Sequence, residues 1–177
     1  MGGYGTLRIG MKYPDVFGAL YAMSSAVSMQ APNAEVVKTQ LTRMAEGIKT
    51  EVRSTVNGVE AQGSAWSANP QNPPYFFDLP FDAEGKVVPL VAEKWTANSP
   101  LVIVDQYVPS LKRFSSIMLD VGNQDGLEAS NTLFAAALKR LGVPHDYEIY
   151  EGTHGNRVGT RFIEKVLPFF EQHLDAK

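Results

Sequence analysis

The apolar pattern is clearest in the last third of the chain. The run SSIMLDVG (115–122) is apolar and bounded by turn residues, which is typical of a buried strand in a parallel sheet. Segment 127–142 has apolar residues at helical spacing and a glycine at its C-terminal end. A strand, HDYEIY (145–150), and a closing helix over 161–174 follow, and Pro168 should kink or split that helix. This order predicts an α/β fold with right-handed crossovers and a mostly parallel sheet flanked by helices.

The first part of the chain predicts a helix, a strand and a second helix. Tyr4, Leu7 and Met11 follow helical spacing, and a proline ends that pattern. The run from Phe17 to Met23 predicts a short buried strand, and 33–50 predicts an amphipathic helix. The first helix follows two glycines, a pair that usually completes a strand-turn-helix unit, yet no strand comes before it.

The middle of the chain is rich in proline and aromatic residues. Seven of the eleven prolines lie between Pro70 and Pro109, and Trp66 and Trp95 lie nearby. Proline removes hydrogen-bond donors and fixes backbone angles, so AWSANPQNPPYFFDLPFDAEGK predicts no regular element. We expect an irregular insertion over 58–110, and its aromatic residues favour a functional loop over a linker.

Composition predicts an ordinary globular protein. The 177 residues fit one domain over 1–177, with 44% hydrophobic and 20% charged residues. A net charge of −3 gives no reason to expect nucleic acid or a membrane as a partner, and no apolar run approaches the ~20 residues that span a bilayer. The first residues do not resemble a secretion signal, which favours the cytoplasm, and a leader further upstream would lie outside this chain.

Cysteine and histidine content limits the possible chemistry. The chain has no cysteine, which excludes disulfides, thiolate catalysis and metals held by cysteine. The three histidines, His145, His154 and His173, lack the spacing of a metal cluster, so we expect no metal site.

Two loops in the last third carry ionisable residues suited to catalysis. Asp125 follows the strand 115–122, and His154 follows the strand 145–150. In an open α/β sheet, ligands bind at the carboxyl ends of the strands, and one strand-helix-strand unit would bring both loops to that edge. A carboxylate that orients an imidazole acting as a general base is the acid-base half of a hydrolase triad.

Each of these positions also has a structural interpretation. Asp125 in NQDG is a common turn former, and His154, flanked by glycines, could be a surface residue. Asp120 competes for the acid role, but its position at a strand end favours a structural hydrogen-bond acceptor. We interpret His145 and His173 as residues of a strand start and of the terminal helix.

The opening residues, taken together with Asp125 and His154, give a more specific pattern than any of them alone. MGGYG is similar to the part of a Gly-x-Ser-x-Gly nucleophile elbow downstream of the serine, with Met1 next to the nucleophile and Gly2 as the last glycine. Asp125 and His154 then follow in the triad order. The sequence resembles the putative-esterase family of α/β-hydrolases, which includes S-formylglutathione hydrolases, feruloyl and acetyl xylan esterases, enterochelin esterases and mycolyltransferases. The matching stretches cover nearly the whole chain: MGGYGTLRIGMKYPDVFGALYAMSS, AWSANPQNPPYFFDLPF, LDVGNQDGL and YEGTHGNRVGTRFIEKVLPFF.

The resemblance is to the C-terminal portion of such an enzyme. The family's nucleophilic serine would be the residue just before Met1, whose backbone N–H would be an oxyanion donor. The earlier strands and the second oxyanion amide would also lie upstream. No other serine completes the motif, and we interpret Ser24 and Ser25 as capping a strand end near the site.

The resemblance implies a serine esterase that forms an acyl-enzyme and needs no cofactor. His154 would be the general base, Asp125 would orient it, and the substrate would be a small-molecule ester of a short acyl or aromatic acid. The Pro- and aromatic-rich stretch would form the substrate pocket. Its candidate residues are Trp66, Tyr75, Phe76 and Trp95.

Without the earlier strands, the sheet would have an unpaired edge beside the 17–23 strand. Such an edge invites pairing with another chain, so we expect a homo-oligomer or dependence on a separate N-terminal segment. The alternative to an esterase is a truncated, inactive α/β-hydrolase fragment that oligomerises or binds ligands or partners. A hydrolase that uses another serine, or a water activated by His154, ranks last because it lacks an oxyanion hole, which is worth about 10²–10³ in rate.

Overall fold

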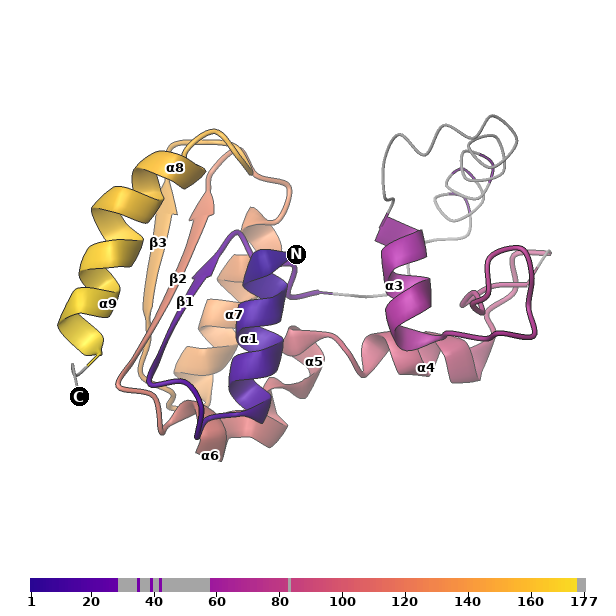
Figure 1. The fold of residues 1–177 in the computed structure, drawn as a ribbon, viewed down its shortest axis with the longest axis horizontal. Coiled ribbons are helices and arrows are strands. Elements are labelled where there is room, and N and C mark those ends of the chain that lie inside the picture. Colours follow the sequence, from indigo (N-terminus) through magenta and orange to yellow (C-terminus); the bar gives the residue numbers. More distant parts are fainter. Residues whose placement is uncertain (29–34, 36–38, 40–41, 43–57, 83, 175–177) are drawn as a thin grey trace. The chain divides into compact units, whose positions relative to one another are not determined.

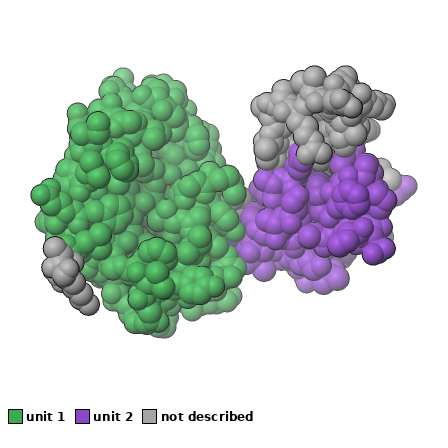
Figure 2. Space-filling model, viewed as in Figure 1, with its two compact units in different colours: residues 1–28, 100–177 green, residues 29–99 purple. Residues whose placement is uncertain are grey.

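The chain packs as two compact units, where the sequence predicts one domain. Unit 1 is made of Met1–Ser28 and Pro100–Lys177, and unit 2 is Met29–Ser99 (Figure 2). The helix predicted over 33–50 lies outside the described residues, apart from three isolated positions within it. The computed structural model describes residues 1–28, 35, 39, 42, 58–82 and 84–174.

Unit 1 contains a parallel sheet in the order β1-β2-β3, which confirms the predicted mostly parallel sheet. Leu20 of β1 pairs with Ile117 of β2, and Asp120 of β2 pairs with Glu148 of β3. The first strand begins two residues later than predicted, because Phe17 is exposed and outside the ladder. The strands are β1 (Ala19–Met23), β2 (Ser116–Gly122) and β3 (Asp146–Tyr150).

Helices cover both faces of this sheet (Figure 1). Helices α1 and α7 pack on the face that carries Leu20 and Ile117, whereas α8 and α9 lie on the opposite face, where Tyr21 meets Phe169 edge to face. The helical elements of unit 1 are α1 (Gly2–Lys12), α5 (Pro100–Ile103), η1 (Val104–Tyr107), α6 (Val108–Leu111), α7 (Glu128–Arg140), α8 (Val158–Arg161), the π-helical turn η2 (Phe162–Val166) and α9 (Leu167–His173).

Two helix ends follow from single residues. The closing helix is split as predicted at Pro168, since the π-helical turn η2 comes directly before α9, whose first turn holds this proline. Helix α7 ends at Arg140, and Gly142 follows two residues later with a φ of 64°. The Gly142 N–H donates to the Lys139 carbonyl, and the Val143 N–H donates to the Leu138 carbonyl. These two bonds satisfy carbonyls in the last turn of the helix.

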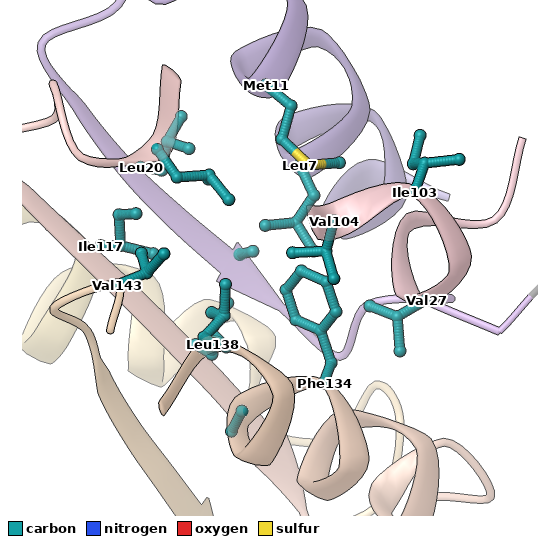
Figure 3. Packing of buried hydrophobic residues seen from close by; sticks show 14 residues of the cluster. Leu7, Met11, Leu20, Val27, Ile103, Val104, Ile117, Phe134, Leu138 and Val143 are labelled. Atoms are coloured by element: carbon teal, nitrogen blue, oxygen red, sulfur yellow. The ribbon is translucent and has the colours of Figure 1, made fainter. Parts of the chain in front are cut away.

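One apolar cluster joins α1, α7 and one face of the sheet (Figure 3). Leu7 and Met11 of α1 and Phe134 and Leu138 of α7 are fully buried, as their helical spacing predicts. Burying side chains of this size contributes about 1.5–3 kcal/mol each, so this layer is a main source of stability in unit 1.

The opening glycines have different roles in the fold. A Cβ at Gly3 would lie 2.3 Å from Ser25 Oγ and 2.4 Å from the Met23 carbonyl oxygen, whereas a Cβ at Gly2 would meet nothing within 4 Å. Gly3 therefore lets the first turn of α1 approach the carboxyl end of β1.

Unit 2 has an apolar core of its own. The sequence predicts an irregular insertion over 58–110, but α3 (Gly58–Trp66) and α4 (Pro89–Thr96) are helices, and residues from Pro100 onwards belong to unit 1. Of the described residues between α3 and α4, the only bridges are Ala68 with Phe77 and Phe81 with Val87. The core of this unit is formed by Val59, Phe77, Val91 and Trp95.

Candidate active site

The loops that follow β2 and β3 run side by side. The Asn123 N–H donates to the Tyr150 carbonyl oxygen at 2.8 Å, and the Gln124 N–H donates to the Gly152 carbonyl oxygen at 2.9 Å. The loops approach so closely that a Cβ at Gly122 would lie 2.2 Å from that same Gly152 oxygen. Backbone contacts therefore fix one loop against the other at the carboxyl ends of adjacent strands.

Asp125 and His154 meet across these loops. Asp125 Oδ2 lies 2.8 Å from His154 Nδ1, which is a hydrogen-bond distance. The Asp125 side chain is 3% exposed and that of His154 is 60% exposed. The buried group is thus the carboxylate, and the imidazole presents its other edge to solvent.

The surroundings of Asp125 favour its ionised form. Burial opposes ionisation, but hydrogen bonds from the Leu127 N–H and from His154 lower the pKa of the Asp125 carboxyl below its ordinary value. An ionised carboxylate only accepts, so Nδ1 of a neutral His154 carries the proton and Nε2 is left as an acceptor. This arrangement can take a proton from a hydroxyl or a water at Nε2.

A second ionic cluster lies under the same two loops. Asp120 is fully buried and accepts hydrogen bonds from the Tyr21 hydroxyl at 2.7 Å and from Arg161 Nε at 2.8 Å. Asp120 is therefore a structural acceptor, as its position predicts. Sequence reasoning missed Arg161 and Glu148, which are joined at 2.8 Å between Nη2 and Oε2. A lone carboxylate inside an apolar strand was the one available signal that a buried cation lies nearby.

The start of α1 lies at this carboxyl edge. Met1 is exposed and its carbonyl accepts the Gly5 N–H at the first turn of the helix. Ser24 and Ser25 are buried beyond the end of β1; the Ser24 N–H bonds the Asp120 carbonyl, and the Ser25 carbonyl accepts from the side chain of Asn131. These bonds use the backbone of the two serines, so the expectation that the serines cap the strand end stays a prediction.

The four pocket candidates all lie in unit 2. Trp95 is fully buried and donates its indole N–H to Ser67 Oγ at 2.9 Å, and Trp66 meets it edge to face. Tyr75 packs against the same core, whereas Phe76 is 55% exposed at a φ of 59°. Only Phe76 of the four offers most of its side chain to a ligand without repacking of the core.

The next two observations concern metal binding and membrane crossing in the described part of the chain. No group of three or more acidic or histidine side chains there could hold a metal ion. Among the same residues, no helix has both the length and the apolar character to cross a bilayer.

Solved structures similar to this chain are enzymes of the α/β-hydrolase fold. A ferulic acid esterase has 19% identity and a TM-score of 0.59, with 98% of this chain and 48% of that chain covered. S-formylglutathione hydrolase from Staphylococcus aureus has 17% identity and a TM-score of 0.51, covering 96% and 50%. The fluorophosphonate-binding serine hydrolase FphF of the same organism has 21% identity and a TM-score of 0.54, again covering 96% and 50%.

These likenesses define the fold and its extent. The chain has part of the α/β-hydrolase fold and spans about half the length of the three structures. No curated protein matches it. The family model described as "Putative esterase" matches residues 1–167, and this chain therefore belongs to that esterase family.

Proposed function

We propose that this chain provides the acid-base half of a carboxylic-ester hydrolase. The observation that carries the proposal is the hydrogen bond between buried Asp125 and exposed His154 at the carboxyl edge of the sheet. Asp125 holds the imidazole in one tautomer and stabilises the imidazolium, while His154 Nε2 faces the reacting groups. Membership of the esterase family supports an ester as the substrate class.

The nucleophile in this proposal is a serine directly upstream of Met1. His154 takes the proton of its hydroxyl as the oxygen attacks the ester carbonyl, and returns that proton to the leaving alcohol. A water then attacks the acyl-enzyme; His154 takes the proton of that water and returns it to the serine oxygen as the acid leaves. The backbone N–H of Met1, within a longer chain, donates to the developing oxyanion. Support comes from Gly3, where a Cβ would lie 2.3 Å from Ser25 Oγ, so the start of α1 lies close to the carboxyl edge of β1.

Of the four residues predicted to line the substrate pocket, Phe76 has the most exposed side chain. Trp95 has its indole N–H satisfied and no exposed surface, so it acts on a ligand only through the packing of unit 2. Short acyl or aromatic-acid esters fit an apolar pocket with few polar groups. No cofactor takes part in this mechanism.

The nucleotide sequence upstream gives the first test. In-frame codons for Gly-x-Ser directly before Met1 are expected, and an in-frame stop codon there would overturn the upstream nucleophile. The protein translated from the longer frame should then react covalently with a fluorophosphonate and hydrolyse p-nitrophenyl acetate. His154→Ala should abolish both, and Asp125→Asn should lower kcat by roughly 10⁴, since a misplaced tautomer cannot accept the serine proton.

A second candidate is a protein without turnover that associates through its sheet edge. Among the described residues, β1 pairs only with β2, and this leaves the other side of β1 as an open edge. Open edges recruit further strands, from a second copy or from a separate N-terminal segment. Covalent fluorophosphonate labelling of the 177-residue chain itself, lost in His154→Ala, would overturn this second candidate.

A further inference from the structure

We infer that Arg161 is a positioning residue for the Asp125–His154 pair. Arg161 follows His154 by seven positions at the end of α8, and its side chain is 8% exposed. It touches neither member of the pair in the described contacts. Its partners instead lie at the bases of the two loops that carry them.

The Arg161 guanidinium joins the last two strands of the sheet. Nε donates to Asp120 Oδ2 at 2.8 Å, and Nη2 and Nη1 donate to the two Glu148 oxygens at 2.8 and 3.2 Å. Asp120 and Glu148 are direct register partners on β2 and β3, so one planar group bridges adjacent strands. This bidentate geometry is specific to arginine, because a lysine ammonium is a point charge without a fork.

The flat face of the Arg161 guanidinium also makes a contact, in addition to the hydrogen bonds from its edge. Its central carbon lies 4.1 Å from the centre of the Tyr150 ring, a cation–π contact. Tyr150 is the last residue of β3, and α8 begins directly after the loop 151–157. Arg161 therefore fixes both ends of the loop that carries His154, while its bond to Asp120 fixes the strand that leads into Asp125.

The charges in this cluster balance. Asp120 and Glu148 face Arg161 and Lys165, whose Nζ lies 3.4 Å from Glu148 Oε2, and Tyr21 adds a neutral donor to Asp120. Hydrogen bonds from Arg161 are the main cause of the lowered pKa of the Glu148 carboxyl. Loss of Arg161 would leave the buried Asp120 carboxylate without a cation and Glu148 with Lys165 alone, which would weaken the link between the two strands at the loop bases.

The inference rests on the proposed function, and its test needs no turnover. In the folded 177-residue chain, the hydrogen-bonded His154 imidazole N–H should give a proton NMR signal, which is assigned by its loss in Asp125→Asn. We expect Arg161→Met to abolish this signal and Arg161→Lys to weaken it at least two-fold. A missing signal in the unmodified chain would instead contradict the Asp125–His154 pair itself, and with it the proposed function.

Two controls separate positioning from stability. Leu138→Ala removes a buried core side chain without touching the loop bases, and should keep the signal although it lowers stability. Arg113→Met breaks an exposed ion pair with Asp15 and should change neither. Wild-type signal intensity in a folded Arg161→Met variant would overturn the inference. If that variant does not fold, Arg161→Lys decides in the same way.

Discussion

The substitution Gly122→Ala tests whether the close approach of the two site loops holds Asp125 against His154. A new Cβ would lie 2.2 Å from the Gly152 carbonyl oxygen and 2.7 Å from its carbonyl carbon. Both atoms belong to the backbone, and the Gln124 N–H already holds that carbonyl at 2.9 Å. Since no side chain can rotate away, the strand ends must separate by about 1 Å to restore van der Waals contact.

The cost of this separation follows from overpacking and from lost geometry. Overpacking a tightly packed site costs about 1–3 kcal/mol. For a protein of this length, each kcal/mol lowers Tm by about 2–4 °C, so we expect a decrease of roughly 2–12 °C. Moving Asp125 Oδ2 about 1 Å away from His154 Nδ1 would take the pair beyond hydrogen-bond distance. In an active, longer chain, an error of this size would lower turnover by about 10²-fold.

The assay combines circular dichroism melting with the NMR signal of the His154 imidazole N–H. Gly126→Ala and Gly155→Ala are matched controls, because a Cβ at either position meets nothing within 4 Å although each glycine adjoins one member of the pair. Both controls should keep the signal. A Gly122→Ala variant with an unchanged Tm and an unchanged signal would refute the argument that backbone contact holds the pair.

Three further predictions concern stability and association. The pKa values of the Asp125 and Glu148 carboxyls are lowered from 3.8 and 4.5, so their ionised forms stabilise the fold above those values. The free energy of unfolding should therefore fall on acidification below about pH 4.5. Glu148→Gln should make this decrease smaller in urea titrations at about pH 2–7. Phe134→Ala should lower the free energy of unfolding by about 3–5 kcal/mol, measured by urea titration, and a loss below about 1 kcal/mol would contradict its place in the core. Light scattering should show concentration-dependent association of the 177-residue chain through the β1 edge, whereas a monodisperse, cooperatively melting monomer would contradict it.

The Asp125–His154 pair was predictable because parallel strands constrain where their loops lie. The residues are far apart in sequence, but each follows a predicted strand, 115–122 or 145–150, and consecutive parallel strands place their carboxyl ends at one edge. The contact at 2.8 Å followed from topology rather than from any local motif. Family resemblance added the order of the residues, and the structure added which of the two is buried.

Arg161 was not predictable in the same way. Its position at the start of a predicted helix is where a solvated arginine is usual, and the chain has 16 lysine and arginine residues that could partner a buried carboxylate. Asp120 signalled that a partner was needed, but sequence spacing does not select it. The choice depends on how α8 packs over β2 and β3, which is a tertiary property.

Aromatic residues show a second limit of sequence patterns. Trp66, Tyr75, Phe76 and Trp95 gave one signal, that of an aromatic-rich stretch, because core packing and a substrate pocket require the same side chains. The structure separates them: Trp95 fills the core of unit 2, whereas Phe76 is exposed in a backbone conformation that residues other than glycine seldom adopt. The pocket assignment of the aromatic residues stays a prediction.

The two faces of the sheet have different roles: the apolar contacts lie on one face, and the ionic contacts that lead to the site loops lie on the other. One face is covered by apolar side chains of α1 and α7, and its burial accounts for much of the stability of unit 1. The other face carries the cluster around Arg161, whose bonds end at the two loop bases. Leu138 and Arg161 pack on opposite faces of the sheet, so Leu138→Ala and Arg161→Lys should lower the free energy of unfolding additively. Only Arg161→Lys should change the His154 signal. Non-additive stabilities together with a signal lost in both variants would mean that the apolar core, and not the ionic cluster, sets the geometry of the pair.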